Sequence, residues 1–118
     1  MDPLERVRRL CLALPETAET TGHGRPVFQV RGKTFAHHMD DHHGDGRVAL
    51  WVKSTHEAQA DAVEAEPERF FVPPYVGPAG WLGLRLDVDP DWEEVEGVLR
   101  EAWRLQAPTR LQALLPPD

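Results

Sequence analysis

Two stretches of the chain repeat apolar residues at spacings of three and four, the pattern of a helix that buries one face. The first stretch comprises Leu4, Val7, Leu10, Cys11 and Leu14. Asp2 can cap this helix, Pro3 suits its first turn, and Pro15 ends it. The second stretch follows Asp89-Pro90 and comprises Trp92, Val95, Leu99, Ala102 and Trp103. We expect both helices to pack their apolar faces against one core.

Between these helices, apolar and polar residues alternate with the period of a β-strand. Residues 26–30 and 33–39 are two such runs separated by Arg31-Gly32, which predicts a tight hairpin with Phe28 opposite Phe35. In this register one face carries Phe28, Val30, Phe35 and Met39, and the other carries Val27, Gln29, Thr34, Ala36 and His38. The preceding residues, 16–24, are polar, and we interpret them as a loop.

The second half of the chain predicts a helix, a shaped loop and further strands. Ser54 has Glu57 three residues later, the capping-box spacing, which predicts a helix up to about residue 65. Residues 73–80 are dense in Pro and Gly, so we expect a connection that is neither helix nor strand. The alternating residues on either side are Val48, Leu50 and Val52, and then Leu82, Leu84 and Leu86. Together these elements predict one α+β domain over residues 1–118, an antiparallel sheet of about five strands with helices packed on one side.

The sheet face opposite the leucines carries the main functional candidates. Alternation places Trp51 and Trp81 on this face, together with Arg47, Lys53 and Arg85. Indole rings beside arginines can stack nucleic acid bases, at about 1–3 kcal/mol per base. The alternative is that a helix or loop of the chain covers this face, which makes the indoles a second core layer.

Other polar and aromatic residues offer weaker candidates. Arg25 and Lys33 can contact a phosphate or simply be exposed charges of the hairpin, and Tyr75 can line a pocket with Trp81 or anchor its loop. The segment from His37 to His43 is rich in zinc-binding side chains, but it matches no zinc signature, and we interpret it as a solvated turn. Because neither a phosphate-binding loop nor a nucleophile motif is present, we expect neither an enzyme nor a cofactor.

Charge and composition limit the partners. The net charge of −7 argues against a general polyanion binder, because nucleic acid is held by positive charge. The charge is uneven, since residues 1–55 hold eight basic and seven acidic side chains, whereas residues 56–118 hold five and thirteen. The single cysteine, Cys11, excludes an intrachain disulfide. With no signal-peptide pattern and no apolar run near the roughly 20 residues that span a bilayer, we expect a cytoplasmic protein that does not enter the membrane.

Three segments carry a family resemblance. They are residues 12–17 (LALPET), residues 23–36 (HGRPVFQVRGKTFA), and residues 67–77 (PERFFVPPYVG) with the GWLG that follows at 80–83. On these segments the chain resembles the MmcQ/YjbR family of small bacterial proteins. The resemblance implies a CyaY-like fold, similar to a double-wing module, and such proteins are often labelled DNA-binding. It implies no catalytic residues, and residues 4–14 lack the acidic helix expected of frataxin-like iron binding.

The leading hypothesis is a non-enzymatic binding domain that contacts DNA through one sheet face. The residues expected to contribute are Arg25, Lys33, Arg47, Trp51, Lys53, Tyr75, Trp81 and Arg85. The alternative is a pocket for a small molecule or peptide between the Pro/Gly loop and the sheet. A third possibility is an interaction module that forms a homodimer through the same face, so that the protein is either a monomer or a homodimer.

Overall fold

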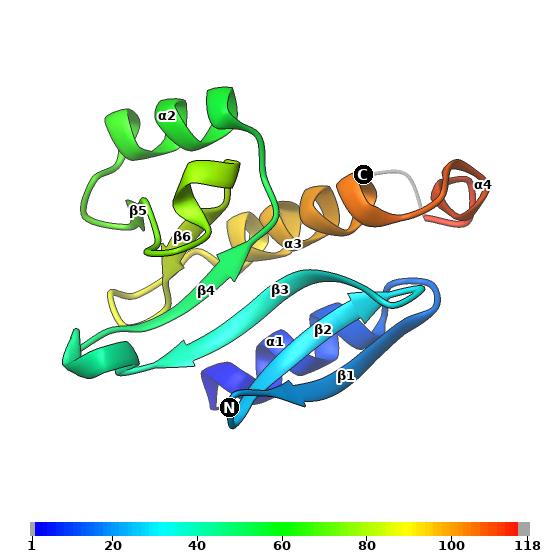
Figure 1. Cartoon of the computed structure of the whole chain (residues 1–118), viewed down its shortest axis with the longest axis horizontal. Helices are drawn as coiled ribbons and strands as arrows, with labels where there is room; N and C mark the ends of the chain where they lie inside the picture. The colour runs from blue at the N-terminus through cyan, green and yellow to red at the C-terminus, as the bar shows by residue number, and fades with distance from the viewer. Residues whose placement is uncertain (1, 116–118) are drawn as a thin grey trace.

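The computed structural model describes residues 2–115, which form one antiparallel sheet and the helices around it (Figure 1). In chain order the elements are α1 (Pro3–Leu12), β1 (Thr17–Gly22), β2 (Arg25–Val30), β3 (Lys33–Asp40), η1 (His42–Gly44), β4 (Val48–Val52), α2 (His56–Ala65), β5 (Phe70–Phe71), η2 (Gly77–Ala79), β6 (Leu82–Arg85), α3 (Trp92–Gln106) and α4 (Thr109–Gln112). The strand order across the sheet is β1-β2-β3-β4-β6-β5, and each neighbouring pair is antiparallel. The predicted α+β class is confirmed, with six strands in place of about five.

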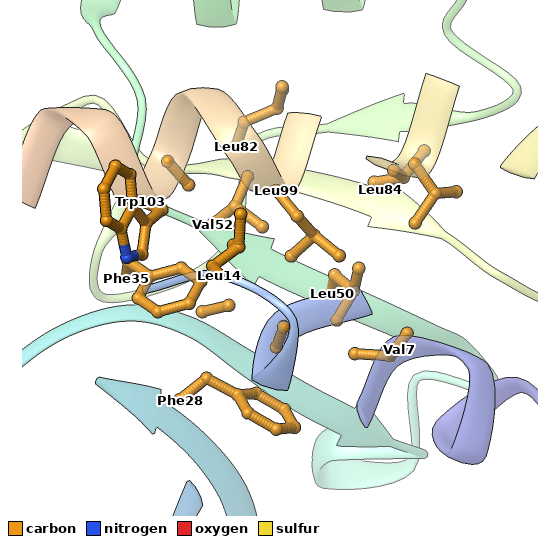
Figure 2. Packing of buried hydrophobic residues seen from close by; sticks show 14 of the residues in the cluster. Val7, Leu14, Phe28, Phe35, Leu50, Val52, Leu82, Leu84, Leu99 and Trp103 are labelled. Carbon is orange, nitrogen blue, oxygen red and sulfur yellow. The ribbon is translucent and has the colours of Figure 1, made fainter. Parts of the chain in front are cut away.

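The main core lies between the sheet and the two amphipathic helices, α1 and α3 (Figure 2). Its members include Val7, Cys11, Leu14, Phe28, Leu50, Val52, Leu84, Leu99 and Trp103. The indole N–H of Trp103 donates to the carbonyl of Pro15 at 3.0 Å, which ties α3 to the end of α1. Asp2 caps α1 as predicted, whereas the side chain of Asp91, and not that of Asp89, caps α3. Among the described helices, none is long and apolar enough to cross a bilayer.

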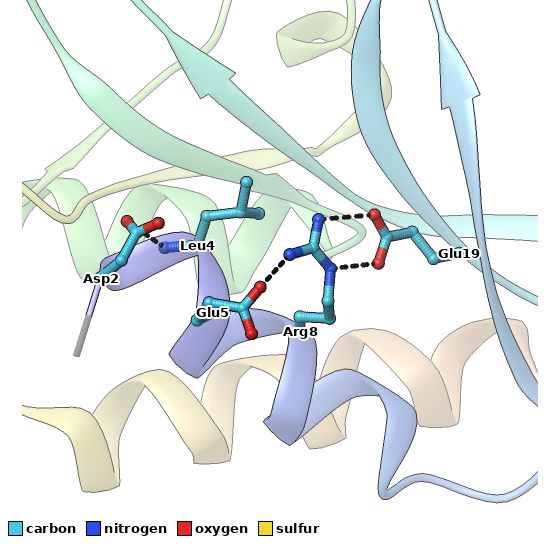
Figure 3. Close-up of polar contacts among 5 residues, drawn as sticks. All are labelled: Asp2, Leu4, Glu5, Arg8 and Glu19. Atoms are coloured by element: carbon cyan, nitrogen blue, oxygen red, sulfur yellow. Dashed lines mark hydrogen bonds and ion pairs between the residues drawn. The ribbon is translucent and has the colours of Figure 1, made fainter.

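The polar segment interpreted as a loop is instead the edge strand β1. It pairs with the whole of β2, from Thr17 opposite Val30 to Gly22 opposite Arg25. Three of its six residues are threonines, whose β-branched side chains favour extended backbone. The carboxylate of Glu19 accepts two hydrogen bonds from Arg8 of α1, at 2.6 and 2.9 Å, and Arg8 also pairs with Glu5 (Figure 3). A strand held by ion pairs at the edge of the sheet needs no apolar alternation, so the pattern did not reveal it.

The predicted pairing of Phe28 with Phe35 is wrong, because β3 contains a β-bulge. Phe28 pairs with Ala36, and Phe35 is the additional residue between two paired positions. One additional residue reverses the faces of the residues that follow it in a strand. Ala36 and His38 therefore lie on the side of the main core, and Met39 lies on the opposite face, the reverse of the expected arrangement.

The helix α2 packs lightly against the rest of the protein. In α2, all of which the structure describes, no residue is buried. Its cap is Thr55, whose hydroxyl accepts the N–H of Ala58 at 3.1 Å, and not Ser54 of the predicted capping box. The Pro/Gly loop contains one short 3-10 turn, η2, where no helix was expected.

Candidate binding pocket

The two tryptophans share a sheet face, as alternation predicted, but their rings are not exposed. Trp51 and Trp81 form a second apolar cluster with Met39, on the face opposite α1 and α3, and Phe71 and Val76 pack against it. The exposed fractions are 3% for Trp51 and 9% for Trp81. The prediction that the two indole rings are exposed and can stack nucleic acid bases is therefore wrong. The alternative, in which the chain covers this face itself, describes the structure.

Gly83 and Phe71 explain how this face is closed. Phe71 lies directly opposite Gly83 in the sheet, and a Cβ atom built on Gly83 would lie 2.4 Å from the Phe71 ring. The space where a side chain of residue 83 would lie is thus filled by the ring of Phe71. The guanidinium of Arg47 lies 4.2 Å from the centre of the same ring, and Arg85 forms an ion pair with Asp87 at 3.0 Å. Both arginines thus contact groups of the protein itself at this end of the face.

The helix α2 holds the Pro/Gly loop over this face. The amide N–H of Gln59 donates to the carbonyls of Gly77 and Trp81, at 2.9 and 2.6 Å. The His56 ring nitrogen Nε2 lies 2.7 Å from the carbonyl of Pro78. Gly80 takes a left-handed conformation with φ of 92°, where its missing side chain lets the loop approach the start of α2 closely. The loop is therefore fixed in place by contacts of α2 side chains with its backbone carbonyls and by the close approach of Gly80 to the start of α2.

A pocket of about 440 Å³ remains between this loop and the sheet. It lies where the β1–β2 turn, β3, η1, β4 and the Pro/Gly loop meet. Its lining residues are Gly22, His23, Arg25, His37, Met39, His42, His43, Trp51, Tyr75 and Val76. We call this the histidine pocket. Its volume lies in the range of about 300–1,000 Å³ that is typical of sites for small molecules.

Aromatic rings form most of the wall. The ring of His42 packs edge-on against Trp51 at 4.7 Å and lies 4.1 Å from His43, and only 8% of His42 is exposed. The interpretation of the histidine segment as a solvated turn is therefore wrong for His42. Tyr75 lies 6.0 Å from His42 and keeps 75% of its surface exposed, so the ring stands at the mouth and does not anchor the loop.

The backbone of Tyr75 is strained. Its φ is 66°, in the left-handed region that residues with side chains rarely adopt. A tight turn accompanies this conformation, since the N–H of Val76 donates to the carbonyl of Pro74 at 2.7 Å. Strain of this kind persists only where the surroundings impose it, and it is frequent at ligand-binding sites. Here it directs an exposed aromatic ring toward the rim of the histidine pocket.

The electrostatics of the pocket are positive or neutral. Among the described residues that line it there is no Asp or Glu. Burial lowers the pKa of His42, with further lowering by His43 and Arg25 and an opposing effect of Asp45. Burial also lowers the pKa of His37, and the neighbouring His23 adds to this. These imidazoles are therefore mainly neutral at pH 7.

One polar group in the pocket wall has no partner. Trp51 is almost fully buried, and its indole N–H makes no hydrogen bond within residues 2–115. A buried donor without a partner costs about 1–3 kcal/mol, so such groups point to a ligand or a bound water.

The predicted site residues are only partly brought together. Arg25, Trp51 and Tyr75 meet in the histidine pocket, while Trp81, Arg47 and Arg85 lie on the adjoining part of the same face. Lys33 lies at the hairpin turn, at the other end of β2 from Arg25, and Lys53 lines a separate groove between α2 and α3. In the described part of the chain, no three side chains are grouped to hold a metal ion.

The sequence did not single out His23 as a site residue. It reaches the pocket because residues 17–22 form a strand that places the β1–β2 turn beside β3. His37, His42 and His43 were noticed only as metal-binding side chains, and their true arrangement follows from the bulge in β3 and the turn of η1.

The fold and the pocket define a small α+β domain with helices on one sheet face and a loop-closed pocket on the other. The family model of YjbR matches residues 12–105, and the chain belongs to the YjbR family. The structure is also similar to the crystal structure of the Deinococcus radiodurans protein DR2400, described as a DUF419 domain. The TM-score is 0.78 at 20% identity, covering 98% of this chain and 91% of that chain, which shows a shared fold. No curated protein matches the chain.

Proposed function

We propose that this YjbR-family domain binds a small aromatic molecule in the histidine pocket and does not transform it. The observation that carries this proposal is the pocket itself, which is preformed between a fixed loop and the sheet and is walled by Trp51, His42 and Tyr75. Aromatic walls favour flat rings, which stack on them or meet them edge-on. The volume of about 440 Å³ suits one or two fused rings with a substituent.

Among its described residues the pocket lacks one common catalytic arrangement. In that arrangement a histidine is the base that activates a Ser, Thr or Cys nucleophile. The described lining of the pocket contains none of these. The single cysteine, Cys11, is fully buried in the main core, where burial raises its pKa, and the single serine, Ser54, lies beside the groove between α2 and α3.

A nuclear magnetic resonance screen of small aromatic compounds tests this proposal. The indole N–H signal of Trp51 and the ring signals of His42 should shift together and saturate. Tyr75→Ala should weaken binding, because it removes a ring from the mouth of the pocket. Val72→Ala is the matched control, since Val72 directly precedes the same loop, is 53% exposed and does not line the pocket. Compounds that shift only signals outside the pocket would refute the proposal.

DNA binding is the second candidate. It is supported by Arg25 and Lys33, two cations of the β2–β3 hairpin that form no ion pair within the described residues. Both indoles are buried, so they do not provide the surface for stacking bases that was expected from the sequence. Any contact would then be with the phosphate backbone, and the affinity would fall with salt at a slope of about −0.9 per neutralised phosphate on duplex DNA.

A mobility-shift assay separates this candidate from the first. If DNA is bound, the shift should appear at low salt, and Arg25→Ala and Lys33→Ala should each reduce the salt slope by about one. No shift with any duplex or single strand at low salt would exclude DNA as the ligand. The aromatic-ligand proposal does not depend on this result.

A further inference from the structure

The histidine pocket departs from the charge of the rest of the molecule. The chain carries a net charge of −7, yet the described residues that line this pocket include one arginine, four histidines and no carboxylate. Elsewhere arginines are neutralised locally, as in the ion pairs of Arg8 with Glu19, Arg31 with Glu16, Arg69 with Glu94 and Arg85 with Asp87. Arg25 has no such partner among residues 2–115. Its charge remains available to a ligand.

The acidic residues nearest the pocket are engaged elsewhere. Asp41 and Asp45 lie in the turn between β3 and β4, next to His42 and His43 in sequence. The carboxylate of Asp41 accepts the N–H of Gly46 at 2.8 Å, and that of Asp45 accepts the N–H of Arg47 at 2.9 Å. Both groups hold the turn, and neither lines the pocket. Arg25 thus shares the lining with four imidazoles, acts electrostatically on His42, and meets no negative group among the described lining residues.

Resting on the function proposed above, we infer that the ligand is an aromatic anion. Its carboxylate or phosphate is held by Arg25 and the surrounding imidazole N–H groups, and its ring packs against Trp51 and Tyr75. Arginine presents planar donors that match both kinds of anion. A cationic ligand meets the like charge of Arg25 and no carboxylate among the described lining residues.

A set of naphthalene compounds with one ring system and different charges tests the inference. The compounds are 2-naphthoate, 2-naphthyl phosphate, the neutral 2-naphthamide and cationic 2-naphthylmethylammonium, titrated at pH 7 and low salt while the Trp51 indole signal is followed. We expect at least one anion to bind about tenfold or more tightly than the amide, the ratio typical of a hydrogen bond to a charged group. The ammonium compound should bind most weakly. The ratio between naphthoate and naphthyl phosphate identifies which anion the site prefers.

Substitution of Arg25 identifies the origin of any preference. Arg25→Gln should abolish the preference for the anion over the amide. Arg31→Gln is the matched control, because Arg31 lies in the same hairpin but pairs with Glu16 outside the pocket. Thermal unfolding of both variants checks that the fold is intact, and the Trp51 and His42 ring signals of the unliganded variants check that the pocket is.

The outcomes separate this inference from the proposed function. Equal affinity for the anion, the amide and the ammonium compound would overturn the inference, while binding of an aromatic molecule in the pocket would stand. An anion preference that Arg25→Gln leaves intact would also overturn it. Failure of all four compounds to shift the Trp51 signal would overturn both.

Discussion

Single residues decide whether the chain can cover the sheet face that carries Trp51 and Trp81, and Gly83 is the clearest case. A methyl group on Gly83 would lie 2.4 Å from the ring of Phe71, so the ring would have to move away from its place beside Trp51. We expect Gly83→Ala to lower the free energy of unfolding by about 1–3 kcal/mol, the usual cost of overpacking. Urea denaturation followed by circular dichroism measures this change.

Gly97 offers the matched control for that substitution. It lies within α3, and a Cβ atom there would meet no heavy atom within 4 Å. Gly97→Ala should therefore raise the free energy of unfolding by about 0.5–1 kcal/mol through helix propensity alone. If Gly83→Ala, like Gly97→Ala, did not lower the free energy of unfolding, the contact with Phe71 would not be what covers this sheet face.

Tyr75 allows stability and binding to be separated at one position. Its backbone is left-handed, a conformation that costs a residue with a side chain about 1–2 kcal/mol and glycine almost nothing. Tyr75→Gly should leave the free energy of unfolding unchanged or raise it slightly, since the ring is exposed. The same variant should bind aromatic ligands about tenfold more weakly.

Thermal melts and the ligand titration, performed on the same sample, check both parts of the Tyr75 prediction. A large loss of stability would show that the ring anchors the loop after all. Unchanged affinity would show that the ring does not take part in binding.

At the scale of elements, α2 holds the Pro/Gly loop in place. Gln59→Ala removes the donor to the carbonyls of Gly77 and Trp81, which we expect to lower the free energy of unfolding by about 1–2 kcal/mol. Amide hydrogen exchange should become faster from residue 76 to residue 81, because the loop opens more often. Glu64→Ala, at an exposed position of the same helix, is the control. Equal exchange rates in the two variants would show that other contacts fix the loop.

The elements that the sequence predicted well are those whose packing follows a regular period. The helices α1 and α3 repeat large apolar side chains every three or four residues. In β6 leucines alternate with Gly83 and Arg85, and in β4 the aliphatic residues Val48, Leu50 and Val52 stand at every second position. The strand β1 has no such period, because its side chains face solvent or α1. The bulge at Phe35 is set by how β3 pairs with β2 and packs on the core, which local sequence does not report.

The candidate site was predictable only as far as it lies on regular strands. Alternation correctly placed Trp51 and Trp81 on one face, because a strand turns each second residue to the same side. The cover over these rings comes from Phe71 and the Pro/Gly loop, and the pocket combines three separate parts of the chain, residues 22–25, 37–51 and 75–76. Such distant contacts depend on the whole fold, so the sequence suggested a pocket beside the loop without defining its walls.

At the scale of the whole molecule, the sheet separates two buried layers with different chemistry. The layer toward α1 and α3 is almost entirely apolar, and the opposite layer carries the aromatic and imidazole groups of the pocket. His38 is an exception, because the bulge in β3 turns it toward the main core. It is only 6% exposed, and its Nε2 atom has no hydrogen-bond partner within the described residues.

This position of His38 predicts how stability depends on pH. Burial lowers its pKa, Arg8 lowers it further, and Asp40 and Asp2 oppose the shift. The folded state therefore keeps His38 neutral at a pH where the unfolded chain, with an ordinary pKa of about 6.5, takes up a proton. The stability that comes from keeping His38 neutral is complete above about pH 6.5. It is lost as the pH falls toward the lower pKa of the folded state.

His38→Leu isolates this contribution, because leucine fits the apolar side of β3 and does not titrate. The free energy of unfolding of the natural chain should fall from pH 7.5 to pH 5.5 more steeply than that of the variant, as measured by urea denaturation at each pH. Part of the slope should remain in the variant, since burial also lowers the pKa of His37 and of His42. If the two slopes were equal, protonation of His38 would not oppose folding, and its imidazole would have to reach water in the folded state. The difference between the slopes thus measures how firmly the part of β3 around His38 is packed on the main core.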